Sequence, residues 1–167
     1  MATSLPFAAP FSREEWNQRA KEDGVVGRHA RHWLAQLDAA RPLPASLPYE
    51  ISAWHFGDTL ALVFLPGEVV VDFSLRLKQE FDPARLWVNA YSNWVPGYIP
   101  SRRILEEGGY EAESSQWYYS NPGRFAPETE DIVMRAVHEG VPPAFRAAPQ
   151  SSGSAGAAPA AEAGSAQ

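Results

Sequence analysis

Leu60-Ala-Leu-Val-Phe-Leu65 is continuously apolar and stops at Pro66-Gly67-Glu68. An apolar run of this length, ended by a Pro-Gly turn, predicts a strand with both of its faces covered. In open α/β proteins, functional side chains gather just past the carboxyl ends of buried strands. The segment therefore predicts an α/β fold, and it makes Glu68 the first candidate for a functional side chain.

The segments on either side of this strand extend the pattern. Residues 49–56 predict a preceding strand, which a turn at Gly57-Asp58 joins to it as a hairpin. After Glu68, apolar residues recur at helical spacing as far as Phe81, and residues 86–91 predict another short strand. We therefore expect a mixed sheet with flanking helices.

A helix is predicted before this region. In Phe11-Ser-Arg-Glu-Glu-Trp16, the serine and the second glutamate have the spacing of a capping box. Phe11 and Trp16 flank the cap as a hydrophobic staple. The helix is expected to continue to about Asp38, with a weak point at Gly24-Val-Val-Gly27.

The composition predicts one folded domain with two less ordered ends. Residues 1–10 are expected to form a flexible N-terminus, and residues 41–48 an extended, proline-rich connector. The domain spans residues 11–146. Residues 147–167 contain almost only Ala, Gly, Ser, Pro and Gln, and we expect a disordered tail there.

Charge and composition exclude several classes of protein. A net charge of −6 argues against a nucleic-acid-binding surface, and the absence of cysteine excludes disulfides and thiolate metal sites. No apolar run approaches the ~20 residues of a transmembrane helix. The N-terminus does not look like a signal peptide, so we expect a cytoplasmic protein. If the native chain starts before Met1, the lost segment could carry an export signal, and a secreted or periplasmic location is the alternative.

Two further motifs follow Glu68 in the chain. With Pro66-Gly67-Glu68 as the first motif, the second is Asn93-Trp-Val-Pro-Gly-Tyr98-Ile-Pro-Ser101, and the third is Tyr110-Glu111, twelve residues after Tyr98. With Pro66-Gly67-Glu68, these motifs resemble, in order and spacing, the C-terminal part of the catalytic domain of neutral/alkaline (non-lysosomal) ceramidases. The shorter bacterial relatives of that family are the most similar. The resemblance covers roughly residues 49–141.

This resemblance implies a zinc-dependent amidase that hydrolyses N-acyl sphingosine or a related lipid amide. It implies that Glu68 and Tyr98 are Zn²⁺ ligands and that Tyr110 is catalytic, steadying the carbonyl oxygen of the substrate. The family takes two zinc histidines and its proposed catalytic serine from an N-terminal half, which this chain lacks. We therefore expect two histidines from outside the chain, from a missing N-terminal half or a partner, and an inactive protein without them.

Each candidate also has a structural alternative. An acid such as Glu68 in a first helical turn gains about 0.3–1 kcal/mol from the helix dipole. Tyr98 and Tyr110 can equally be aromatic residues that pack their own loops. His29 and His32 are three residues apart but flanked by arginines, which favours a solvated helix face over a metal site.

An unusually aromatic set of residues follows the predicted sheet, and we expect it to lie near the site. Its members are Trp87, Trp94, Trp117, Tyr118 and Tyr119. This set suits contact with an acyl chain, with the missing half or with another copy of the chain, and exposed apolar surface of that kind is uncommon in monomers. The alternative function is therefore a non-catalytic binding or assembly module that forms oligomers through this aromatic surface.

Overall fold

The computed structural model describes residues 1–147, so the tail expected over residues 147–167 lies, beyond its first residue, outside the described part of the chain. In chain order the elements are β1 (Ala2–Pro6), α1 (Arg13–Arg19), α2 (Gly24–Asp38), β2 (Ser46–Glu50), β3 (Ser52–Phe56), β4 (Leu60–Phe64), β5 (Glu68–Val69), α3 (Val71–Glu80), β6 (Leu86–Asn89), β7 (Tyr98–Ile99), α4 (Arg102–Glu107), η1 (Ser114–Tyr119), α5 (Thr129–Gly140) and η2 (Pro143–Phe145).

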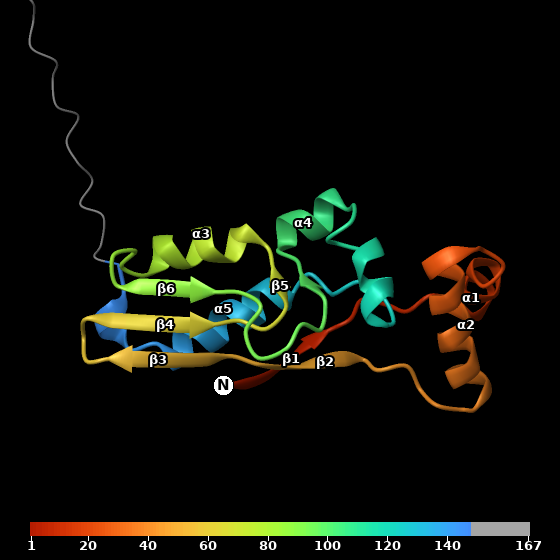
Figure 1. The fold of residues 1–167 in the computed structure, drawn as a ribbon, viewed down its shortest axis with the longest axis horizontal. Coiled ribbons are helices and arrows are strands. Elements are labelled where there is room, and N and C mark those ends of the chain that lie inside the picture. The colour runs from red at the N-terminus through yellow and green to blue at the C-terminus, as the bar shows by residue number, and fades with distance from the viewer. Residues whose placement is uncertain (148–167) are drawn as a thin grey trace, which may run out of the picture.

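The structure confirms the predicted α/β class, with a mixed sheet and flanking helices. β3 and β4 form the expected antiparallel hairpin, and β4 pairs in parallel with β6 to give the strand order β3-β4-β6. α3 connects β4 to β6, and α5 lies along the same sheet (Figure 1). The apolar run that begins at Leu60 thus supplies the central strand.

The main core lies on one face of this sheet. Ala61 and Val63 of β4 are fully buried there, together with Phe73 and Leu77 of α3 and Val137 of α5. The expectation that both faces of β4 are covered was wrong. Its alternate residues are only half-buried, because α3 and α5 both pack on the core side.

The N-terminus differs from the flexible segment expected over residues 1–10. β1 pairs antiparallel with β2, which places Thr3 opposite Tyr49 and Leu5 opposite Leu47. The expected extended connector therefore ends in a strand that begins at Ser46. Pairing satisfies the backbone donors and acceptors of both segments, and Leu5 is fully buried in the main core.

The predicted helix start is confirmed, but the single long helix was wrong. The capping box is complete, and the rings of Phe11 and Trp16 lie 5.0 Å apart. The chain turns between α1 and α2, which allows Trp16 to pack against Ala30 and Trp33 in a second small core. A continuous helix would have left Trp16 without that cover. Figure 1 shows α1 and α2 at one end of the molecule, apart from the β3-β4-β6 sheet.

Candidate functional site

Glu68 and Tyr98, the two residues that the resemblance identified as metal ligands, lie next to each other. β5 and β7 are short parallel strands, and their register places Glu68 directly opposite Tyr98. Pro66 and Gly67 carry the chain from the end of β4 to Glu68. The two motifs therefore meet at the carboxyl end of the sheet, where the sequence predicted a site.

Backbone hydrogen bonds fix the Pro66-Gly67-Glu68 turn to the loop after β6. The Gly67 amide donates to the Trp94 carbonyl and the Glu68 amide to the Gly97 carbonyl, both at 2.9 Å. In return, the Tyr91 amide donates to the Gly67 carbonyl at 2.9 Å. These bonds hold Glu68 against the second motif without any contribution from its side chain.

Gly97 is required where this loop packs on two buried amide side chains. Its φ is +139°, and a Cβ there would lie 2.9 Å from Gln116 Oε1 and 3.0 Å from Asn121 Nδ2. Gln116 Nε2 donates to the Tyr98 carbonyl at 3.0 Å, and Asn121 Nδ2 donates to the Pro96 carbonyl at 2.9 Å and to Gln116 Oε1 at 2.7 Å. The amide pair thereby positions the backbone of Tyr98. Sequence reasoning missed both residues.

Three phenols surround the Glu68 carboxylate. Tyr91 donates a hydrogen bond to it at 2.9 Å, and Tyr119 donates another. Burial raises the pKa of Glu68, but hydrogen bonds from Tyr119, Tyr98 and Tyr91 outweigh burial and lower that pKa below its ordinary value. The hydrogen bond to Glu68 in turn raises the pKa of Tyr98 and of Tyr119 to about 12. At neutral pH the site therefore holds an ionised carboxylate and neutral phenols.

Tyr110 lies beside Tyr98. Their rings meet edge to face with centroids 5.6 Å apart, and the side chain of Tyr110 is half exposed. Gly108 and Gly109 both have positive φ, and a Cβ at either would meet nothing within 4 Å. The two glycines are therefore needed for the backbone conformation of the turn, and not because another part of the site lies close to them.

Ser101, the last residue of the second motif, has a structural role. It is buried, it caps α4 by accepting a hydrogen bond from the Ile104 amide at 3.2 Å, and it donates to Asp72. Arg103 pairs with the same carboxylate at 2.8 Å. Hydrogen bonds from Arg103, and then from Ser101, outweigh burial and lower the pKa of Asp72.

The donor set fits one side of a zinc site. Carboxylate oxygen is a common zinc ligand, and a phenol becomes one when the charge of the metal promotes its ionisation. Catalytic zinc usually takes three protein ligands. Across residues 1–147, His, Cys, Asp and Glu side chains form no group of three or more that could hold a metal. The remaining ligands would have to come from outside the described chain.

His29 does not lie on a solvated helix face, so that expectation was wrong for this residue. It is buried against Trp16 and Trp117, with ring centroids 5.5 and 6.3 Å away, and its Nε2 lies 2.6 Å from the Asn121 carbonyl oxygen. Burial lowers the pKa of His29. His32, one turn further along α2, is exposed as predicted.

The predicted aromatic set does not gather on one surface. Trp87 projects from β6, Trp94 lies beside Thr3 and Tyr49, and Trp117 packs against His29. Tyr119 donates to Glu68 as described above, and it is the member of the set that belongs to the site. These aromatic residues are close in sequence, but their side chains point in different directions. Their spacing in the sequence therefore did not predict that they would be separated in the structure.

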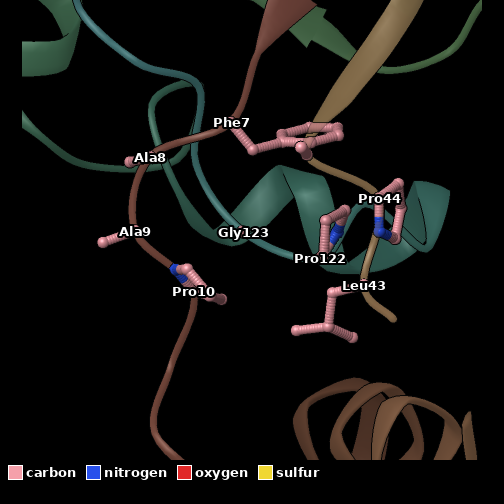
Figure 2. Close-up of a pocket in the computed structure, with 9 residues that line it drawn as sticks. Phe7, Ala8, Ala9, Pro10, Leu43, Pro44, Pro122 and Gly123 are labelled. Atoms are coloured by element: carbon pink, nitrogen blue, oxygen red, sulfur yellow. The ribbon is translucent and has the colours of Figure 1, made fainter. Parts of the chain in front are cut away.

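A separate apolar pocket of about 240 Å³ lies between the segment that follows β1 and the segment that precedes β2 (Figure 2). Its wall is formed by Phe7, Ala8, Ala9, Pro10, Leu43, Pro44, Ala45, Pro122 and Gly123. None of these side chains is titratable, and none belongs to the Glu68 site. The pocket therefore offers apolar contact but no group for acid–base or metal chemistry.

Comparison with protein-family models, with curated proteins and with solved structures gives no match for this chain. In the described residues, no helix has both the length and the apolar character needed to cross a membrane. The features of this chain that bear on function are therefore the three motifs and the geometry that brings Glu68, Tyr98 and Tyr110 together.

Proposed function

We propose that this chain forms the glutamate and tyrosine side of a zinc-dependent amide hydrolase acting on N-acyl sphingosine or a related lipid amide. The observation that carries this proposal is the β5–β7 register, which sets Glu68 opposite Tyr98. Tyr110 packs on Tyr98 from a third motif. Three sequence segments thus supply, at one place, the carboxylate and phenols that the ceramidase resemblance implies.

The electrostatics of the site suit these roles. Because tyrosine hydrogen bonds lower the pKa of Glu68, this carboxylate is ionised and ready to bind a cation at neutral pH. Tyr98 would be the second ligand, and it must lose a proton that Glu68 otherwise helps to retain. When bound, zinc would polarise the amide carbonyl and lower the pKa of a bound water.

Tyr110 has the position of a hydrogen-bond donor for the substrate. Its half-exposed ring stands beside Tyr98, so a carbonyl group near the two ligands is within the reach of a phenol. Such a donor stabilises the negative charge that develops on the carbonyl oxygen during attack. We assign this role to Tyr110 and the metal-ligand role to Glu68 and Tyr98.

A zinc titration with the histidines replaced by added imidazole tests the ligand assignment. We expect weak zinc binding by the chain alone and tighter binding when imidazole is present, measured by calorimetry. Glu68→Gln and Tyr98→Phe should each weaken binding by about tenfold or more, because each removes one of two protein ligands. Loss of the Tyr98 proton should appear as tyrosinate absorbance on metal addition.

Matched substitutions away from the site are the controls. Tyr118→Phe and Glu106→Gln change exposed residues of the same types, and they should leave the zinc affinity unchanged. If Glu68→Gln binds zinc as well as the parent chain with imidazole present, the metal assignment is wrong. If the substitution weakens zinc binding as expected, hydrolysis of a lipid amide should be tested with a partner chain that supplies histidines.

The alternative is a non-catalytic binding or assembly module. It is favoured by exposed aromatic side chains on the sheet, such as Trp54 and Trp87. In that case Glu68→Gln would alter stability alone, and neither the parent nor the variant chain would have affinity for zinc. The same titration therefore separates the two functions.

A further inference from the structure

The face of the β3-β4-β6 sheet opposite the main core is apolar and exposed. Six of its side chains are apolar: Trp54, Phe56, Leu60, Leu62, Phe64 and Trp87. Ser52 and Asn89, which both lie opposite Phe64, are the polar residues at one end of the face. Trp54, Phe56 and Trp87 are 60%, 55% and 59% exposed, and the three residues of β4 are half-buried. None of the six side chains carries a charge.

Strand register makes the outer face continuous. Trp54 lies opposite Leu62, and Leu62 lies opposite Trp87, so the three side chains form one row across the sheet. The ring of Phe64 lies 5.1 Å from that of Trp54. The alternating residue Val63 points to the core, as the pleat requires. The outer face is therefore a single surface that spans three strands.

A bare apolar face is unusual for this architecture. All-parallel sheets have both faces covered, and an antiparallel sheet that leaves one face to solvent normally carries polar residues there. In this mixed sheet the uncovered face is largely apolar. With aromatic side chains of about 150–250 Å², the three exposed residues alone present about 350 Å². This is within the range of the largest apolar patch on a typical monomer, roughly 300–600 Å², before the β4 side chains are added. Such patches usually mark an interaction site.

We propose that the outer face is the interface of a symmetric homodimer. The residues beyond position 147 contain no Leu, Ile, Val, Met or aromatic side chain, so the tail lacks the chemistry to cover the face. A second copy of the chain offers an equally apolar, uncharged surface. Two outer faces would bury about 700 Å² from the aromatic residues alone, nearly half of a standard interface of about 1,600 Å², before the β4 side chains are added.

The row across the sheet suits a two-fold axis. An axis parallel to β4 and passing over Leu62 sets Trp54 of each copy opposite Trp87 of the other, because both tryptophans flank Leu62 at the same level. Such a contact is isologous and closes after two subunits. Face-to-face sheets pack about 10 Å apart, which leaves room for interdigitated aromatic side chains. The proposal requires neither zinc nor catalysis.

Sedimentation of the full chain over a range of concentrations tests the proposal. We expect a reversible dimer, and we expect the Trp54→Gln/Trp87→Gln double variant to dissociate about 100-fold more readily, since aromatic residues at the centre of an interface are typical hot spots. Trp94→Gln changes a tryptophan that is 46% exposed outside the outer face, and it should leave the dimer intact. Circular dichroism would verify that the variants are folded.

A second measurement needs no variant. Hydroxyl-radical footprinting of the parent chain should show Trp54 and Trp87 protected at high concentration and oxidised on dilution, with Trp94 oxidised equally at both. A parent chain that sediments as a monomer at all concentrations would overturn the proposal, and the outer face would then belong to a different partner. A dimer that persists in the double variant, or equal oxidation of Trp54 at both concentrations, would also overturn it.

Discussion

Replacing Gly97 by alanine should be one of the most damaging single-methyl changes in this protein. The backbone there has a φ of +139°, which costs a residue with a Cβ about 1–3 kcal/mol. The new methyl would also meet Gln116 Oε1 at 2.9 Å and Asn121 Nδ2 at 3.0 Å. Those amides are buried and bonded to each other, and disrupting such a bond costs about 1–3 kcal/mol. We expect a loss of about 4 kcal/mol.

Urea unfolding followed by tryptophan fluorescence measures this loss, and two other glycines provide graded controls. Gly109 has a positive φ but open space around a Cβ, so Gly109→Ala should cost only the backbone part, about 1–2 kcal/mol. Gly123 has neither a positive φ nor a close neighbour, so Gly123→Ala should change stability by less than about 1 kcal/mol. The difference in stability loss between Gly97→Ala and Gly109→Ala therefore measures the cost of the close contacts with Gln116 and Asn121.

The reasoning would be refuted if Gly97→Ala cost no more than Gly109→Ala. That result would mean that Gln116 and Asn121 move aside freely, and that the amide pair does not hold the backbone of Tyr98. A loss of several kcal/mol in the free energy of unfolding would support the reasoning. Such a loss is a large part of the ~5–15 kcal/mol of a typical domain.

Two further predictions concern titration. Glu68→Gln removes the carboxylate whose hydrogen bonds and charge raise the pKa of Tyr98 and Tyr119 to about 12, so both phenols should titrate nearer the ordinary value of ~10, measured by NMR of labelled tyrosine. Burial lowers the pKa of His29 in the folded chain below the ordinary value of 6.5. The stability that neutral, buried His29 contributes is therefore fully present above pH 6.5. It is lost as pH falls from 6.5 through the lowered folded pKa, because the unfolded chain binds the proton more readily. His29→Gln should flatten this part of the acid dependence of the unfolding free energy, and His32→Gln should retain it.

The parts of the fold that follow from local chemistry could be predicted from the sequence. The capping box at Ser12 satisfies backbone groups within four residues, and the β3–β4 hairpin closes over one short turn at Gly57. The helix after Glu68 follows from the spacing of Phe73 and Leu77. In each case the interacting residues are close in the chain, so their pattern survives in the sequence.

The candidate site was only partly predictable for the same reason. Glu68 stood out because a carboxylate follows an apolar strand, and Tyr98 and Tyr110 stood out because their motifs resemble those of ceramidases. Gln116 carries no such signal, and Tyr119 stood out only as one member of the aromatic set expected near the site. They reach the site because η1 folds back against the loop between β6 and β7, where Tyr119 meets Glu68 and Gln116 binds the Tyr98 carbonyl.

The sequence by itself determined the α/β class, the central strand from Leu60, and the identity of the carboxylate beyond that strand. Tertiary structure alone decided that residues 2–6 pair with β2, that His29 is buried, and that α3 and α5 pack on the same face of the sheet. Periodicity shows that a residue prefers an apolar neighbour, but it does not show which distant segment supplies one. That choice depends on how the packed elements share a limited apolar surface, and here it left the outer face of the sheet exposed.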